Sequence, residues 1–248
     1  MNLKKNIISE IQHYVIEKNN PKEYYRLPIV KFASAQDPLF NKLKEIVDET
    51  HLLPKDILSD AVTVISYFIP FSYDVIESNR ISDEVSFKWG DTYNDCNQLL
   101  FDLGLHLTNY LANFNIKIGT YTKGYKDGCL FTGWSQKSVA YIAGMGTFGL
   151  NHTLITDAGC AGRFGSIVIN ADIAPDALQI NDKCLYKQGN NCSYCIDHCP
   201  ISALTLTTLD KDLCYRRTME VSNSFDFESL CDVCGKCTLG PCAIYKHY

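Results

Sequence analysis

The chain has 248 residues, of which 46% are hydrophobic and 21% are charged, and its formal net charge is −5. These proportions supply enough apolar side chains for a packed core and exclude a disordered chain. The negative balance argues against an extended basic surface for duplex nucleic acid.

Residues 1–20 predict an amphipathic helix with Ile8, Ile11 and Val15 on one face. This segment has neither the apolar run nor the small-residue cleavage site of a secretory signal. No stretch of the sequence approaches the run of about eighteen apolar residues that a membrane span needs. We therefore expect a cytoplasmic protein with no membrane partner.

The next segments predict a helix, a strand and a second helix. The first helix should begin with Asp37 as its N-cap and Pro38 at its first position. Residues 61–69 are apolar and β-branched, which predicts a buried strand. Leucines at helical spacing predict a long helix over residues 91–114.

Three further segments complete the mixed pattern. Residues 117–122 predict a strand, and Ser135 should cap a short helix over residues 135–143. Residues 153–173 predict two strands joined by a glycine-rich turn. Apolar density then falls over residues 174–182. We expect an α+β fold with a boundary near residue 178, which gives one domain over 1–178 and another over 179–248.

The cysteines are concentrated at the C-terminal end of the sequence. Of the twelve, Cys96, Cys129 and Cys160 are scattered, and we expect Cys129 and Cys160 to be buried structural thiols. The other nine lie between Cys184 and Cys242. In a reducing compartment such a pattern indicates metal binding more than disulfide bonding.

The spacing within this segment favours iron–sulfur chemistry. Residues 192–200 have the pattern C-x2-C-x3-C-P, which is most of a ferredoxin run, and Cys184 supplies the displaced first cysteine. Zinc is an alternative because zinc sites also use C-x2-C pairs, and disulfides are a second alternative.

Two four-iron clusters need about eight thiolates, and the segment offers nine. Interleaving of the two halves of a ferredoxin run predicts the ligands. The first cluster would take Cys184, Cys192, Cys195 and Cys242. The second would take Cys199, Cys214, Cys234 and Cys237. Cys231 is then spare, and Gly235 eases the turn of the C-G-K-C pair; the alternative arrangement uses Cys231 and frees Cys242.

A glycine run from Gly144 to Gly149 matches G-x-G-x-x-G. A dinucleotide site needs a strand before this motif and a helix opening within it. Here a predicted helix precedes the run and a predicted strand follows it. The glycines are therefore expected to form a tight connection between helix and strand.

The order of the glycine run, a Gly-Ser strand and the cysteine segment resembles the epoxyqueuosine reductase family, which is similar in turn to the core of reductive dehalogenases. The resemblance covers about residues 60–242. The matching positions are Ala143, Gly144, Gly146, Gly149, Asn151, Leu154, Ile155, Gly165 and Ser166.

This resemblance implies a cobalamin-binding, nitroreductase-like α/β domain followed by a ferredoxin-like domain with two 4Fe–4S clusters. Electrons from a low-potential donor would pass through the clusters to a cobalamin held base-off. The implied cofactor-binding residues are Gly144, Gly146, Gly149, Asn151, Gly165 and Ser166.

Two more residues are candidates for the cofactor face. His152 could approach cobalt or a substrate, and a hydrogen-bonded strand histidine is the alternative. Arg163 could bind a phosphate or a propionamide, and a surface turn residue is the alternative.

The sequence departs from the family where the acidic proton donor is expected. Leu130 occupies that position, with Gly133 and Gln136 in place of the family's Pro and Glu, and Leu150 replaces a lysine. The candidates for the missing donor are Asp127, Ser135, Lys137 and Tyr141. Their ordinary alternatives are a helix cap, a solvated lysine and a packed tyrosine.

The family's C-terminal tRNA-binding repeats have no counterpart before Tyr248, so tRNA is an unlikely substrate and we expect a small molecule or a corrinoid. Three functions remain open. The chain could be a cobalamin-dependent oxidoreductase, an electron-transfer protein with a flavin- or partner-binding domain, or a protein that reduces a corrinoid for another enzyme.

Overall fold

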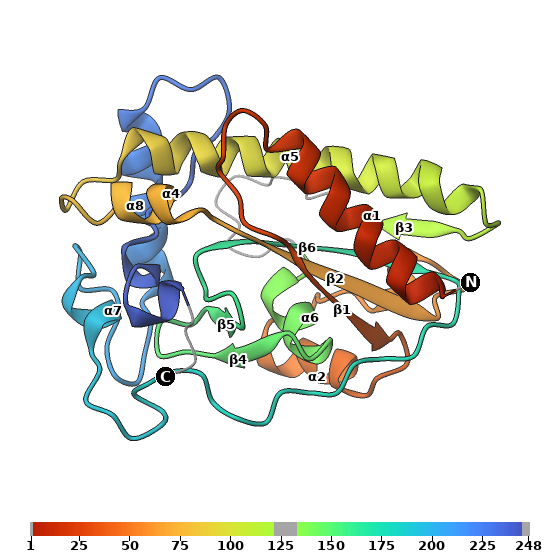
Figure 1. Cartoon of the computed structure of the whole chain (residues 1–248). Coiled ribbons are helices and arrows are strands. Elements are labelled where there is room, and N and C mark those ends of the chain that lie inside the picture. Colours follow the sequence, from red (N-terminus) through yellow and green to blue (C-terminus); the bar gives the residue numbers. More distant parts are fainter. Residues whose placement is uncertain (1, 122–132, 245–248) are drawn as a thin grey trace.

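An antiparallel four-stranded sheet forms the centre of the fold (Figure 1). The structure is a computed structural model and describes residues 2–121 and 133–244. The sheet has the order β1-β2-β6-β3. Its strands are β1 (Ile29–Ser34), β2 (Thr63–Pro70), β3 (Ile118–Thr120) and β6 (Gly162–Ile169).

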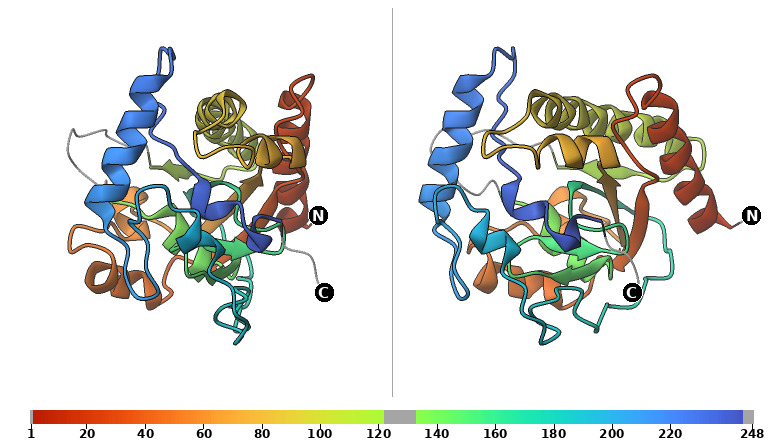
Figure 2. Two further views of the ribbon diagram at one scale, coloured as in Figure 1. Left: turned by 90° about the vertical axis from the view of Figure 1, so that its left-hand side faces the viewer. Right: turned by 60° about the vertical axis from the view of Figure 1, so that its left-hand side comes forward.

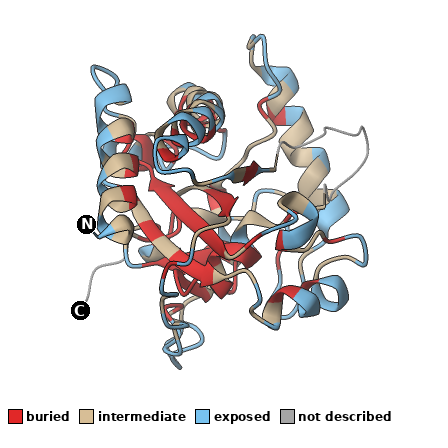
Figure 3. Cartoon of the chain, turned by 90° about the vertical axis from the view of Figure 1, so that its right-hand side faces the viewer, coloured by how far each residue is buried: buried red, intermediate tan, exposed pale blue. Residues whose placement is uncertain are grey.

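Helices cover both faces of this sheet. On one face, α1 (Leu3–Lys18) packs against α5 (Phe87–Ala112), and their apolar side chains share a core with β2 and β6. On the other face lie α2 (Leu39–Ile46) and α6 (Gln136–Ile142), which close a second apolar cluster (Figure 1). Figure 3 shows that the buried residues gather on the sheet and on the helix faces turned toward it.

Strand β2 lies at the middle of the core because its sequence is almost entirely apolar. All of its residues are buried, and its register pairs Thr63 with Ser34 and Ile169, and Pro70 with Gly162. The prediction of a buried strand over residues 61–69 is therefore confirmed. Since every pairing in the sheet is antiparallel, the glycine run has no parallel βαβ unit around it.

The long predicted helix is also confirmed, with an earlier start. Leu99, Leu103, Leu107 and Leu111 are buried on one face of α5. The helix begins at Phe87 because the Ser86 hydroxyl accepts a hydrogen bond from the Trp89 amide.

Helix α1 buries Ile7, Ile11 and Val15, whereas Ile8 is only half-buried. Ile8 nevertheless packs against the same core, so the predicted face is confirmed. Ile7 extends this face, since it lies one and two turns before Ile11 and Val15.

The remaining elements lie around the sheet and at one end of it. They are α3 (Pro54–Ile57), α4 (Tyr73–Ser78), β4 (Gly146–Phe148), β5 (Leu154–Thr156), α7 (Tyr194–Asp197), α8 (Lys211–Ser224) and the 3₁₀ turns η1 (Lys236–Thr238) and η2 (Pro241–Ala243). The glycine run connects α6 to the β4–β5 hairpin, as expected.

The cysteine-rich segment gathers at one end of the sheet, where α7, η1 and η2 lie together beside α8 (Figure 2). It shares a core with the first part of the chain, because Val221, Leu239 and Ala243 belong to the same apolar cluster as α1 and α5. Within the described residues, no helix has the length and apolar character to cross a membrane.

Candidate metal centre

Five thiols line one pocket at the junction of the β4–β5 hairpin and the C-terminal segment. They are Cys184, Cys192, Cys195, Cys237 and Cys242. The other walls are mostly apolar and include Leu150, Ile155, Tyr194 and Pro241. Parts of the chain that are distant in sequence therefore build one sulfur-rich site.

Local backbone features place these thiols. Cys195 lies in the single turn of α7, and Cys242 follows Pro241 in η2. The Cys160 amide donates a 2.9 Å hydrogen bond to the Cys242 carbonyl, which ties the last cysteine to the glycine-rich turn before β6. Gly235 has φ of 75°, a left-handed conformation that suits glycine at this turn.

Three of the other thiols in this pocket and burial together affect Cys195. Its pKa is raised to about 11, first by burial and then by the thiols of Cys242, Cys184 and Cys192. A thiolate at one of these positions therefore disfavours the deprotonation of a second thiol unless a cation lies between them.

The thiols of Cys199, Cys214, Cys234 and Cys237 form a second group. The pKa of Cys237 is raised to about 12, first by burial and then by the thiols of Cys234, Cys214, Cys195 and Cys199. Burial also raises the pKa of Cys214, and Cys234 and Cys199 raise it again. Cys237 adjoins both groups, since it also lines the pocket of the first.

Cys231 stands apart from both groups. Its side chain is fully buried, and its thiol donates to the Gly90 carbonyl with a sulfur–oxygen distance of 3.6 Å. Burial raises its pKa to about 11, and the charges that add to this shift are Asp232 and Asp91 rather than other thiols. The ninth thiol of the segment thus faces α5.

Cys160 lies beside the first group, which the sequence did not indicate. Its sulfur is 3.7 Å from the Cys242 sulfur and the same distance from the Asn151 amide nitrogen. The hydrogen bond from Cys160 lowers the pKa of the Cys242 thiol and raises that of Cys160. Its proximity to Cys242 arises only from tertiary folding.

Two cationic side chains lie near Cys234 of the second group: burial raises the pKa of its thiol, and Arg217 and Lys236 oppose this shift. The buried Lys236 ammonium donates to the carbonyls of Asn79, Ser82 and Glu84 at 2.6, 2.6 and 2.8 Å. All three of its protons are therefore used, and the 79–84 loop is attached to the turn that carries Cys234. Sequence reasoning missed this lysine because nothing near it in the sequence marks it as buried.

Two of the residues predicted as proton donors, Ser135 and Tyr141, have structural roles in the fold. The Ser135 hydroxyl caps α6 by accepting from the Ser138 amide at 3.4 Å. The Tyr141 ring packs on Phe148 with centroids 5.9 Å apart. Asp127 lies outside the described residues.

Lys137 is the exception among these candidates. Its ammonium donates to the His152 carbonyl at 3.1 Å, and desolvation lowers its pKa although the residue as a whole is exposed. The thiols of Cys237 and Cys214 oppose this shift by stabilising the ammonium. Lys137 therefore lies on the side of α6 nearest the second thiol group.

The glycines of the predicted cofactor face have close backbone neighbours. A Cβ on Gly144 would lie 2.1 Å from the Ala177 carbonyl oxygen, and one on Gly146 the same distance from the Ile155 oxygen. A Cβ on Gly149 would meet the Asn151 side chain at 2.8 Å. These three positions thus have a packing reason for glycine.

The other predicted cofactor residues are divided between the two faces of β6. Arg163 donates to Asn97 of α5 at 2.7 Å, and Gly165 faces the same helix. Ser166 lies on the α6 face, where its hydroxyl accepts from the Trp134 indole at 2.9 Å and donates to Gln136 at 2.7 Å.

Asn151 and His152 adjoin the thiols from the hairpin side. The Asn151 amide donates to the Cys237 carbonyl at 3.1 Å as well as to the Cys160 sulfur. His152 is exposed with φ of 52°, and desolvation lowers its pKa, with Lys137 as the largest charge contribution.

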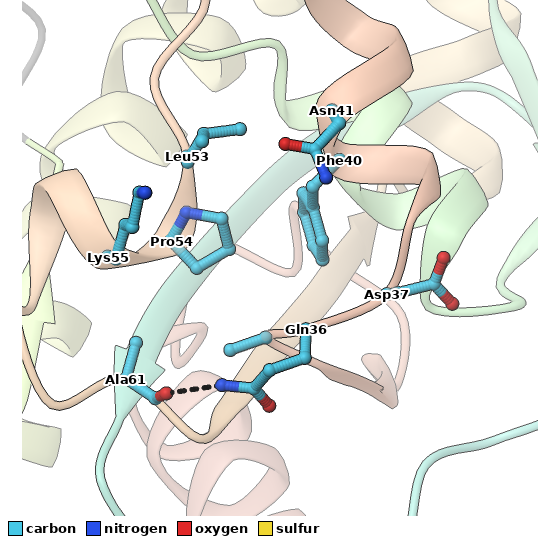
Figure 4. A pocket seen from close by; sticks show the side chains of 9 residues that line it. Gln36, Asp37, Phe40, Asn41, Leu53, Pro54, Lys55 and Ala61 are labelled. Carbon is cyan, nitrogen blue, oxygen red and sulfur yellow. Dashed lines mark hydrogen bonds between the residues drawn. The ribbon is translucent and has the colours of Figure 1, made fainter.

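A second pocket lies between α2 and α3, away from the thiols (Figure 4). Its volume is about 280 Å³, and Gln36, Asp37, Phe40 and Lys55 are among its lining residues. The Gln36 amide donates to the Ala61 carbonyl at 2.8 Å across its floor. None of the described predicted site residues lines it.

The thiol donor set suits iron–sulfur clusters. In residues 2–121 and 133–244, no three His, Cys, Asp or Glu side chains are arranged to bind a single metal ion. A 4Fe–4S cube takes one thiolate on each of its four irons and therefore spaces its ligands more widely than one ion does. Bound iron would also supply the positive charge that thiolates in this apolar setting lack.

These features define a class of protein: an α+β fold with an antiparallel sheet and a thiol-rich site. No family model matches the chain, and no curated protein matches it. Its fold is that of solved epoxyqueuosine reductases, so the resemblance noted in the sequence is confirmed for the fold.

Three of these structures illustrate the similarity. The Streptococcus thermophilus enzyme is 18% identical with a TM-score of 0.59 over 96% of this chain and 65% of that one. The Bacillus subtilis enzyme, with its catalytic loop swung out of the active site, is 16% identical with a TM-score of 0.52, over 96% of this chain and 67% of that one. An epoxyqueuosine reductase in complex with an epoxyqueuosine-modified tRNA stem loop is 17% identical with a TM-score of 0.53, over 96% of this chain and 68% of that one. This chain thus spans about two thirds of the length of each.

Proposed function

We propose that the chain is an iron–sulfur oxidoreductase with two 4Fe–4S clusters in a ferredoxin-like C-terminal domain. One cluster is held by Cys184, Cys192, Cys195 and Cys242, and the other by Cys199, Cys214, Cys234 and Cys237. The observation that carries this proposal is the pocket lined by Cys184, Cys192, Cys195, Cys237 and Cys242, while the Cys231 thiol faces the Gly90 carbonyl instead.

The second part of the proposal is a base-off cobalamin bound by the first domain. The fold supports it, as do buried polar atoms that lack hydrogen-bond partners among the described residues, namely both amide atoms of Asn94 and Nε of Arg163. A bound molecule with amide side chains would satisfy them. When bound, cobalamin would supply a metal centre that accepts electrons for a reductive reaction.

The chain's own residues would bind and orient this group and deliver a proton. Arg163 is positioned by Asn97 and by the Tyr93 ring, 4.3 Å away, and its buried Nε has no hydrogen-bond partner among the described residues. Lys137 is the best of the described proton-donor candidates, because its ammonium lies beside His152 and desolvation lowers its pKa, which eases the transfer of a proton.

The substrate in this proposal is a small molecule or a corrinoid. The tRNA in the complex described above belongs to that enzyme, and a net charge of −5 does not favour a polyanionic substrate. A chain that only transfers electrons is the second candidate, because Leu130 occupies the position of the family's acidic donor.

Anaerobic reconstitution tests the two parts separately. We expect about eight irons and eight sulfides per chain, and a shift of the absorption of added hydroxocobalamin to its base-off form. Iron without a cobalamin shift would leave the electron-transfer function, with flavin binding as the next measurement. About four irons, or two zinc ions, would contradict the paired clusters.

A matched pair of variants locates the cofactor face. Arg163→Gln should weaken cobalamin binding by about ten- to a hundredfold, since a hydrogen bond from a charged group contributes about 1.5–3 kcal/mol. Arg216→Gln removes the same charge from an exposed position on α8 and should bind normally. Equal affinities in the two variants would exclude Arg163 from the cofactor site.

A further inference from the structure

Cys160 is a buried thiol that is not among the proposed cluster ligands. It is 2% exposed and lies in the turn before β6, well separated in sequence from the cysteine-rich segment. Its contacts determine what it can do, because a protonated thiol has one hydrogen to donate and can also accept.

The backbone holds Cys160 in register with Cys242. The Cys160 amide donates to the Cys242 carbonyl at 2.9 Å, and the Ala161 amide donates to the Ala243 carbonyl at 3.5 Å. Glycine is needed next to this bridge, because a Cβ on Gly159 would lie 2.0 Å from the Ala243 oxygen. The approach of the two sulfurs is therefore built into the main chain.

The side chains of Asn151 and Cys160 form a short chain of hydrogen bonds that ends at the Cys242 sulfur. The Asn151 amide donates to the Cys160 sulfur at 3.7 Å, and Cys160 is 3.7 Å from the Cys242 sulfur. Asn151 is itself fixed by its second bond, to the Cys237 carbonyl at 3.1 Å. The Thr238 carbonyl, at 3.6 Å, is the other acceptor within reach of the Cys160 hydrogen.

We propose that Cys160 is a positioning residue whose S–H donates a hydrogen bond to the Cys242 ligand of the first cluster and raises the reduction potential of that cluster. This inference rests on the proposed function, since it requires a cluster on Cys242. A thiolate that binds iron is a stronger acceptor than the neutral Thr238 carbonyl. Hydrogen bonds to cluster sulfurs stabilise the more negative, reduced state.

The test compares three variants of the full chain after anaerobic reconstitution. Cys160→Ala removes the donor, and Cys160→Ser keeps a donor in the same place. Cys96→Ala is the matched control, because Cys96 is also a fully buried thiol but lies in α5 outside both thiol groups. Iron content and redox titrations of each cluster are the measurements.

We expect all three variants to retain about eight irons. In Cys160→Ala, the reduction equilibrium of one cluster should shift up to about tenfold toward the oxidised form, which is about 59 mV for one electron. Cys160→Ser and Cys96→Ala should match the unsubstituted chain, and the second cluster should not change in any variant.

Three results would overturn the inference without contradicting the presence of clusters in the unsubstituted chain. Loss of about half of the iron in Cys160→Ala would make Cys160 a ligand. Unchanged potentials in Cys160→Ala, or an equal shift in Cys160→Ser, would show that the S–H does not act on Cys242. An unsubstituted chain that takes up no iron would instead contradict the proposed function, and this inference with it.

Discussion

Two left-handed glycines of the cysteine-rich segment differ in a way that allows a quantitative test. Gly235 and Gly189 have φ of 75° and 88°. A Cβ on Gly189 would meet nothing within 4 Å, whereas a Cβ on Gly235 would lie 2.3 Å from Cζ2 of the buried Trp89. Alanine at the two positions therefore has similar backbone strain and very different packing.

The expected free energies follow from these two terms. Left-handed backbone costs an alanine about 1–2 kcal/mol, so Gly189→Ala should destabilise the chain by about that amount. Gly235→Ala adds the displacement of the Trp89 ring, and overpacking of a core costs about 1–3 kcal/mol. Its total is about 2–5 kcal/mol.

Guanidinium unfolding of both variants, compared under one metal and redox condition, measures the difference. Gly235→Ala should also reconstitute with less iron, because its turn lies between Cys234 and Cys237. Equal loss of unfolding free energy in the two variants would refute the packing argument. Full iron in Gly235→Ala would show that the turn adapts without cost to the ligands.

Further variants test the ligands, the cationic surroundings and the pH response. Cys231→Ser should keep about eight irons and Cys242→Ser should lose about half, because an alkoxide replaces a soft thiolate poorly; the opposite pattern by iron analysis would favour the alternative arrangement of ligands. Lys236→Met should lower the reduction potential of the second cluster. It should also destabilise the chain by about 2 kcal/mol or more, since it leaves three carbonyls without their donor. Lys187→Met, at an exposed position, is the control in redox and unfolding titrations. Burial lowers the pKa of His51, whose Nδ1 contacts the Leu52 carbonyl while Nε2 accepts from the Ser135 amide. The unfolded chain therefore binds the proton more readily, and stability should fall as the pH drops below about 6.5 and level off below the folded pKa; NMR titration of His51 showing a pKa above 6.5 would contradict this.

The features that the sequence predicted well depend on local pattern. Strand β2 and helix α5 have apolar patterns long enough to identify them. The turn between Cys234 and Cys237 has a glycine, Gly235, at the position whose φ requires one. Strand β1 was not recognised because its residues include Lys31 and Ser34 and give no clear alternation. The fold similarity could be inferred from the order of motifs, although no single motif was specific.

The features that the sequence could not predict depend on tertiary contact. Nothing in the spacing pairs Cys160 with Cys242, and the burial of Lys236 depends on a loop far away in the chain. The division of Arg163 and Ser166 between opposite faces of β6 follows from strand geometry once the strand is known. The glycine run drew attention as a binding motif, yet its glycines have packing reasons.

The shared core has a consequence for modular exchange. Val221, Leu239 and Ala243 belong to the same apolar cluster as Ile11 and the α5 leucines. Removing the cysteine-rich segment would therefore expose apolar surface on the remaining helices instead of liberating an independent unit. Transfer of this cysteine-rich segment to another protein would therefore also require a new apolar surface in place of the one that α5 provides.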